Sequence, residues 1–196
     1  MGQEDPGRPL IDFAPLLRHA SPSVRFYFHA GETILVGGAA DENLVDALLL
    51  NTSRMGHAFA LRHHPVLRDL AKSRRVAIEV CPLSNQVLKL VHDLRDHPIV
   101  AFVAEGLPVT ISPDDPALWG ATGSSYDFAM AFMALGDASG LAALKQIALN
   151  SLELSASSQS VQAREIGTWR AAWAAWVARV AAGATADVGA ASYAAH

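Results

Sequence analysis

The chain has 196 residues, of which 51% are hydrophobic and 17% charged, enough for one domain with a sizeable core. Its net charge of −4 gives no reason to expect binding to nucleic acid or to an anionic membrane. No apolar run reaches the roughly 18 residues that a membrane span requires, and the first residues lack the basic and apolar regions of a signal peptide.

Cys81 is the only cysteine, so neither an internal disulfide nor a cysteine-rich zinc site is expected. It stands in the apolar run of residues 76–82, and we interpret it as a small buried residue rather than a nucleophile. A single cysteine does not identify the compartment in which the protein works.

The first part of the chain alternates short strands with helices. Residues 24–29 are predicted to form a strand, because an apolar, aromatic run ends there at a polar tip. Residues 54–57 are predicted as a second strand, and residues 65–73 as the helix that follows it. Between these strands, Asp41 is predicted to cap a helix that runs to Asn51. One face of this helix is expected to hold four apolar residues, Leu44, Val45, Leu48 and Leu49.

The alternation continues with an apolar third strand over residues 76–80, a pattern typical of a parallel sheet covered on both faces. Residues 107–112 are predicted as the fourth strand, after Gly106 has ended the preceding helix. Helices are predicted in four further segments, residues 85–91, 98–105, 126–135 and 141–150.

Alternating strands and helices indicate an α/β fold with a parallel sheet. Each strand carries its polar residue at the C-terminal end, where ligands bind in barrels and in open α/β sheets. The spacing of the units suits a (β/α)8 barrel of the TIM type, which takes roughly 250 residues. Four strand–helix units therefore predict about half of such a barrel.

A last helix is predicted over residues 160–180. Trp169, Trp173 and Trp176 share one face of this helix, which we interpret as a surface packed against the barrel rather than a ligand platform. We expect residues 1–182 to belong to the barrel and residues 183–196, which are rich in small side chains, to be a disordered tail.

Two of the strand ends carry residues suited to a metal-dependent hydrolase. His29 ends the first strand and Glu32 follows in the loop, while Asp114 and Asp115 follow the fourth strand. Imidazole nitrogens and carboxylate oxygens are ordinary zinc ligands, and a rigid strand end can hold them in place. Taken alone, His29 is more often a structural histidine, and the two aspartates are as readily explained by a turn or a helix cap as by a metal site. Their occurrence together at strand ends favours a metal site.

The other histidines carry a weaker signal. His57 ends the second strand, a position where a structural role is more common than a catalytic one. His63 and His64 are predicted to be exposed or to cap a helix. For four histidines the sequence identifies no partner, namely His19, His92, His97 and His196.

Three motifs resemble the adenosine deaminase family, in the family's order: HAGE at residues 29–32, MGH at 55–57 and SPDDP at 112–116. Three further stretches resemble its extracellular branch, the adenosine deaminase-related growth factors: DENLVDAL at 41–48, EVCPLSNQVLKL at 79–90 and DPALWG at 115–120. The similarity runs from Gly2 to about Val180. It implies a (β/α)8 barrel with one zinc ion, of which this chain is the C-terminal part.

The resemblance also implies roles for particular residues. His29 resembles the third zinc-binding histidine of the family, and Asp114 the zinc-binding aspartate. Glu32 resembles the residue that protonates purine N1. His57 resembles the histidine that orients or deprotonates the zinc-bound water, and Asp115 the aspartate that holds purine N7.

Gly2 resembles a backbone group that meets the purine from the family's fourth strand. The implied reaction is hydrolytic deamination of adenosine or 2′-deoxyadenosine, which gives inosine or deoxyinosine and ammonia. The expected partner is therefore a small purine nucleoside. Members of the branch are typically secreted, which leaves the compartment of this chain open because its sequence contains no signal peptide.

The chain departs from the family in three respects. It lacks the His-x-His that supplies the first two zinc ligands, because by motif match it begins at the end of the family's fourth strand. Ala58 stands where the family usually has glycine, and Pro113 where it usually has serine. We expect the isolated chain to be inactive and to require an N-terminal half or a second copy of itself.

Two alternatives remain open at this point. The chain could be a non-catalytic half-barrel that acts as a partner or regulator of another protein. It could also come from a deaminase that acts on a different purine.

Overall fold

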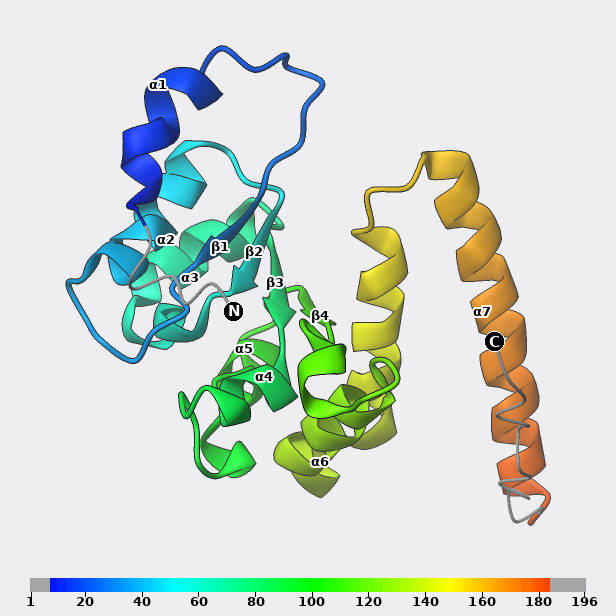
Figure 1. Cartoon of the computed structure of the whole chain (residues 1–196). Helices are drawn as coiled ribbons and strands as arrows, with labels where there is room; N and C mark the ends of the chain where they lie inside the picture. The colour runs from blue at the N-terminus through cyan, green and yellow to red at the C-terminus, as the bar shows by residue number, and fades with distance from the viewer. Residues whose placement is uncertain (1–7, 184–196) are drawn as a thin grey trace. The chain divides into compact units, whose positions relative to one another are not determined.

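The structure is a computed structural model that describes residues 8–183, apart from the side chains of residues 137–139 (Figure 1). It contains two compact units, one that extends to Ser151 and one that begins at Leu152, and each is described by itself. In this described part, no helix is both long enough and apolar enough to cross a bilayer.

A parallel sheet of four strands lies at the centre of the first unit (Figure 1). The strands are β1 (Tyr27–Ala30), β2 (Arg54–His57), β3 (Ala77–Val80) and β4 (Val109–Ile111), and each pairs with the one before it. The predicted parallel α/β arrangement is therefore confirmed. The bounds of β2 are those predicted, whereas β1 begins later than predicted and extends to Ala30.

Helices follow the strands, as the alternation predicted. α2 (Ala39–Leu49) connects β1 to β2, α3 (Pro65–Ser73) connects β2 to β3, and α5 (Ile99–Ala104) precedes β4. α6 (Ser125–Glu153) follows β4. A short helix before β1, α1 (Ala14–Leu17), was not predicted, because a single turn is too brief to show helical periodicity.

The hydrophobic core lies between one face of the sheet and the helices. Successive strand residues point to opposite faces, so every second strand residue enters this core. The largest contributors come from both layers: Met55, Ile78, Val80 and Val109 from the strands, and Leu44, Leu48, Ile99 and Phe102 from the helices. Cys81, at the end of β3, is buried as predicted.

The opposite face of the sheet carries polar side chains. Arg54 Nε lies 2.5 Å from Glu79 Oε1 on the neighbouring strand, and the Arg54 guanidinium lies 4.3 Å from the centre of the Tyr27 ring. A paired charge of this kind can be held in a sheltered place because each partner satisfies the other.

The start of α2 differs from the prediction. Gly38, not Asp41, occupies the cap position, and Asp41 is buried in the first turn. Its carboxylate accepts the Gly37 N–H at 2.8 Å and lies 2.6 Å from His64 Nε2, so Asp41 ties the preceding loop and α3 to the helix.

The apolar face of α2 is also narrower than predicted. Leu44 and Leu48 are buried, but Val45 and Leu49 are exposed, because the small residues Ala40 and Ala47 complete the buried face instead.

Two further helices correct the predicted bounds. The helix predicted over residues 85–91 is α4 (Pro82–Val87), which begins with proline at a first-turn position that needs no N–H. The helices predicted over residues 126–135 and 141–150 are both part of α6. Gly136 and Gly140 have non-helical dihedral angles within α6, so the predicted interruption between the two segments is present in the backbone.

The second unit contains α7 (Gln159–Ala181), close to the predicted bounds. The Trp169 and Trp173 rings stack 5.3 Å apart, and the Trp173 and Trp176 rings lie 5.1 Å apart with their planes tilted by 45°, so the three rings form a row along a single helix face. Packing of this face against the barrel remains a prediction. The predicted tail lies, apart from its first residue, outside the described residues.

Candidate metal centre

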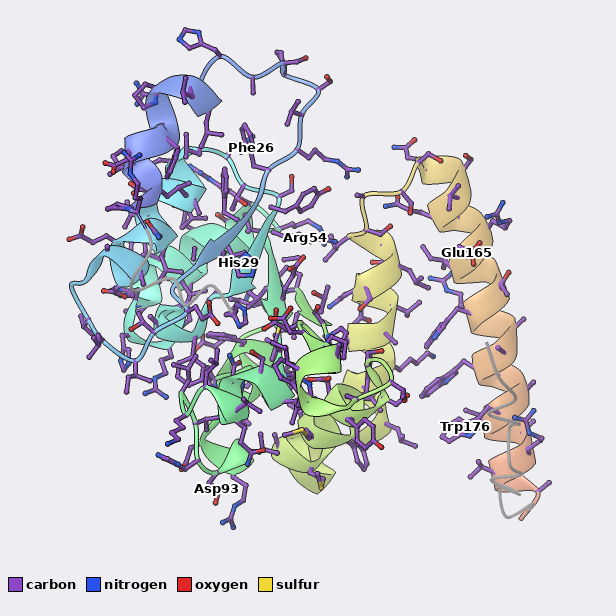
Figure 2. All side chains as sticks on the ribbon, viewed as in Figure 1. Phe26, His29, Arg54, Asp93, Glu165 and Trp176 are labelled. Carbon is purple, nitrogen blue, oxygen red and sulfur yellow. The ribbon has the colours of Figure 1, made fainter. Side chains whose placement is uncertain are left out.

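The C-terminal ends of β1, β2 and β4 bring three ligand-type side chains together. One ligand atom from each of His29, His57 and Asp114 lies within 4.8 Å of the other two. These residues are far apart in the sequence, and the parallel sheet juxtaposes them because its strands all end at the same edge. Figure 2 labels His29 at the end of β1.

His29 stands on the exposed side of this group. It pairs in register with Gly56 of β2, whose missing side chain leaves room for the imidazole ring. The ring centres of His29 and His57 lie 5.2 Å apart, with their planes tilted by 39°. His29 is thus positioned by strand pairing, with a free approach for a ligand from the open side.

Glu32 is a buried residue of the site, with 6% of its surface exposed. The chain turns towards it at Gly31, whose φ of +73° favours glycine. A Cβ at Gly31 would lie 2.8 Å from Leu44 Cδ2, so a larger residue would displace the core. Glu32 Oε1 lies 3.6 Å from His57 Nε2.

Glu32 also borders a hollow of about 250 Å³. The hollow's other walls come from the following loop and from the segment after α4, with Thr33, Ile34, Leu88, Lys89 and Leu90 among them.

His57 is buried at the end of β2, at 3% exposure. Its Nε2 lies 3.8 Å from Asp114 Oδ2. Burial lowers the pKa of His57 to about 4, with the Asp114 charge opposing and the His29 charge assisting this shift. His57 is therefore neutral at neutral pH.

The backbone makes a tight turn at His57 and Ala58. His57 and Ala58 both have left-handed backbone conformations, with φ values of +57° and +43°. A non-glycine residue in this region carries strain of about 1 kcal/mol or more. The Ala58 methyl group that replaces the family's glycine is fully buried beside the site.

Asp114 and Asp115 occupy different environments. Asp114 is half-buried with a φ of +55°, and its N–H lies 3.5 Å from Ser112 Oγ. Pro113 leaves this hydrogen bond in place because the N–H belongs to the following residue. Asp115 is exposed and stands at the start of the 3-10 helix Pro116–Trp119, without a side-chain capping bond.

Of the predicted residues, the structure brings His29, Glu32, His57 and Asp114 together. Asp115 adjoins them in the chain, and Gly2 lies outside the described residues.

Two residues of the site were missed by the sequence reasoning. Asn85 Nδ2 lies 3.2 Å from His57 Nδ1, and His97 Nε2 lies 3.0 Å from Asn85 Oδ1. Both residues are buried. His57, Asn85 and His97 lie on separate segments, so no sequence spacing links them. The one available signal was a polar residue, Asn85, a few positions after an apolar strand, where a buried side chain needs a hydrogen-bond partner.

The donor set fits a zinc ion. Zinc binds imidazole nitrogen and carboxylate oxygen at about 2.0–2.2 Å, which places two ligand atoms about 3–4 Å apart. The three candidate atoms lie within 4.8 Å of one another, so small side-chain rotations would bring a histidine and Asp114 to these distances.

A family model for adenosine deaminase matches residues 13–167 of the chain. Adenosine deaminase 2-A of Danio rerio is 54% identical over 159 residues, which cover 79% of this chain and 32% of that protein. Adenosine deaminase 2 of Sus scrofa is 48% identical over 187 residues, which cover 93% of this chain and 37% of that protein. The chain thus spans about a third of the length of these relatives.

Two crystal structures share the fold. An adenine deaminase from Arthrobacter aurescens matches with a TM-score of 0.71 and 28% identity, over 83% of this chain and 49% of that one. An amidohydrolase from Burkholderia ambifaria, solved with bound zinc, matches with a TM-score of 0.72 and 28% identity, over 92% of this chain and 48% of that one.

These neighbours have the amidohydrolase TIM-barrel fold, so the four-stranded sheet is part of such a barrel, as predicted. Motifs, fold and family match agree: the chain belongs to the adenosine deaminase family and, through its adenosine deaminase 2 relatives, to the branch of the adenosine deaminase-related growth factors.

Proposed function

We propose that the chain is the C-terminal part of a zinc-dependent enzyme that deaminates adenosine and 2′-deoxyadenosine. The observation that carries this proposal is the convergence of His29, His57 and Asp114 beside the buried Glu32. Other amidohydrolase-type chemistry is less favoured, because two relatives of this chain that are 54% and 48% identical to it are adenosine deaminases.

In this proposal His29 and Asp114 hold the zinc ion. When bound, zinc lowers the pKa of a coordinated water molecule and so supplies a nucleophile near neutral pH. Asp114 contributes a negative charge at the ion, and the exposed side of His29 leaves the approach to the ion open.

Glu32 acts as the proton donor for purine N1 in this scheme. It lies low in the site, at 6% exposure, where a carboxyl group can hold a proton away from bulk water. The hollow beside it provides apolar side chains, including Leu88 and Leu90, against which a flat purine ring can lie.

Asp115 and the backbone of Gly2 complete the proposed substrate contacts, with Asp115 at purine N7 and Gly2 meeting the purine from the strand that precedes β1. The exposed position of Asp115 suits a residue that meets the substrate at the rim of the site. We also propose that the parent protein works outside the cell, as the growth-factor branch implies.

The proposed site is incomplete within the chain as given. Catalytic zinc normally takes three or more protein ligands, and the two predicted ligands here are His29 and Asp114. The polar sheet face with Arg54 and Glu79 is the surface that a barrel encloses, and β1 and β4 are the edges of the described sheet. We propose that an N-terminal half of the barrel covers this face and supplies the missing ligands.

The test compares two proteins. One is the 196-residue chain, and the other is a full-length protein that contains it behind an N-terminal half. For each, bound zinc is measured and adenosine loss is followed by absorbance. Zinc and steady turnover are expected from the full-length protein only. The half-barrel proposal is wrong if the 196-residue chain binds one zinc and turns over adenosine, and the deaminase proposal is wrong if zinc-loaded full-length protein leaves adenosine unchanged.

A further inference from the structure

His57 has two ring nitrogens, and only one of them faces the candidate metal centre. Nε2 lies 3.6 Å from Glu32 Oε1 and 3.8 Å from Asp114 Oδ2, whereas Nδ1 faces Asn85 in the protein interior. A neutral imidazole carries one N–H and one lone pair. The nitrogen that carries the proton therefore decides whether His57 donates or accepts a hydrogen bond at the site.

A series of hydrogen bonds determines which nitrogen of His57 carries the proton. The series begins at a backbone N–H, which can only be a donor. The backbone N–H of Ile99 can only donate, and it lies 3.0 Å from His97 Nδ1. His97 Nδ1 must therefore accept, so neutral His97 carries its proton on Nε2. This Nε2–H lies 3.0 Å from the Asn85 side chain and can only donate to it.

The Asn85 amide transmits the constraint to His57. Its oxygen must face His97, because His97 Nε2 donates, so its NH₂ group faces His57 Nδ1 at 3.2 Å. An amide NH₂ donates and cannot accept. His57 Nδ1 must accept, and the single proton of neutral His57 therefore lies on Nε2.

The residues of this hydrogen-bond network are shielded from solvent by the packing around them. Asn85 is fully buried, His57 and His97 are nearly so, and the His97 ring packs edge-on against Phe59 with ring centres 5.6 Å apart. Burial and the positive charge of Arg62 lower the pKa of His97 to about 4, so this ring is neutral, as its acceptance of the Ile99 N–H requires. The Asn85 amide that faces His57 Nδ1 likewise requires that nitrogen to carry no proton.

We propose that Asn85 and His97 are positioning residues that hold His57 in the tautomer with its proton on Nε2. His57 then presents an N–H to the centre, so it is a hydrogen-bond donor there. It can neither bind the metal through Nε2 nor take a proton from the attacking water at that atom. This inference rests on the proposed function for its catalytic meaning, but the tautomer itself does not.

The first test reads the tautomer directly and needs neither zinc nor turnover. The 196-residue chain is labelled with ¹⁵N in its histidine rings, and ring ¹H–¹⁵N correlations distinguish protonated from bare nitrogens. His57 and His97 are both expected to carry the proton on Nε2. A proton on Nδ1 of either ring would overturn the proposal, whatever the enzymatic activity.

Substitutions then test which atoms donate and which accept in the hydrogen bonds that link His97, Asn85 and His57. Asn85→Asp places a carboxylate, which only accepts, opposite His57 Nδ1, so the His57 proton should move to Nδ1. His97→Gln retains a donor for the Asn85 oxygen and should preserve the parental tautomer. His97→Phe keeps the ring shape and its packing on Phe59 but loses both nitrogens, so both tautomers of His57 should appear. His92→Phe, at an exposed histidine of the same segment, is the matched control.

The same variants in the full-length protein give a second, independent measurement. Asn85→Asp should keep zinc and leave KM within a few-fold, but lower kcat by at least about 10²-fold, since a wrong histidine tautomer lowers kcat about 10⁴-fold in a serine protease. His97→Gln and His92→Phe should stay within about threefold of the parent. An Asn85→Asp enzyme with parental kcat would refute the positioning role. A parent that binds zinc but does not deaminate adenosine would instead refute the proposed function, leaving the tautomer result to stand on its own.

Discussion

The imidazole of His29 lies against the bare Cα of Gly56 on the neighbouring strand, and a Cβ at Gly56 would come within 3.3 Å of the His29 ring. Such a contact is tighter than ordinary packing, so the ring would have to move by a few tenths of an ångström. The glycine thus sets the position of a proposed metal ligand from the adjacent strand.

Gly56→Ala should therefore weaken zinc binding without unfolding the protein. The backbone at Gly56 is not left-handed, so alanine brings no dihedral strain there. We expect about a tenfold loss of zinc affinity in the full-length protein, at the low end of the effect of disturbing the support of a metal ligand. Gly167→Ala is the control, because nothing lies within 4 Å of its Cβ position. Zinc affinity within twofold of the parent for Gly56→Ala would contradict the proposed role of His29.

Glu32→Gln tests the proposed proton donor in the full-length protein. The amide has nearly the same size as the carboxyl group, so zinc content should be unchanged. It cannot deliver a proton, so kcat should fall by about 10²–10⁴-fold, the usual worth of general acid catalysis. The measurement is kcat for adenosine alongside zinc per protein. A variant with kcat within threefold of the parent would remove Glu32 from this role.

Asp114→Ala and Asp115→Ala should separate the two neighbouring carboxylates. The Asp114 carboxylate lies within the candidate centre, so its loss should remove zinc. Asp115 is exposed and outside that centre, so its loss should leave zinc bound but raise KM for adenosine. Metal content and KM of both variants provide the check. The reverse pattern would mean that the roles are exchanged.

His97 should make the stability of the first unit sensitive to mild acid. Its pKa is lowered to about 4 by burial and by Arg62, against about 6.5 in an unfolded chain. Between these values the unfolded chain binds a proton that the folded chain does not, so the free energy of unfolding should be unaffected above pH 6.5 and decrease as the pH falls towards 4. The expected loss from His97 is about 3 kcal/mol at pH 4, and His57 acts in the same direction.

Urea unfolding of the 196-residue chain at pH 7 and at pH 4.5 measures this effect. His97→Gln keeps a hydrogen-bonding side chain but no titrating ring, so its free energy of unfolding should change less between the two pH values. His92→Gln, at an exposed position, should retain the parental difference. An equal pH dependence in the parent and in His97→Gln would contradict this prediction.

Much of the fold could be predicted because its signals are local. Residues 54–57 and 65–73 have the predicted bounds, and Pro65 marks the start of the helix because proline is favoured in a first helical turn. The role predicted for Asp41 was wrong because a capping residue and a buried first-turn carboxylate have the same sequence signature. Only packing against His64 distinguishes them, and that contact joins residues 23 positions apart.

Some residues of the candidate site could likewise be predicted from the sequence, and others could not. His29, His57 and Asp114 could be predicted because each ends a strand, and parallel strands bring their ends to one edge. Asn85 and His97 could not, because their importance lies in which atom of one faces which atom of the other. That relation depends on how α4 and the segment before α5 settle on the sheet, and no periodicity in the sequence records it.

The order of the strands has a consequence for how this half of the barrel is made. Because β1 to β4 pair in the order in which they occur in the chain, no pairing has to wait for a strand that is synthesised later. Each new strand pairs with the strand directly before it in the chain, so only one connecting segment is closed into a loop at each step. The loss of chain entropy on closing that loop therefore stays small. A ribosome that releases this segment can therefore let the sheet grow one strand at a time, and Asp114 joins His29 and His57 only after β4 has emerged.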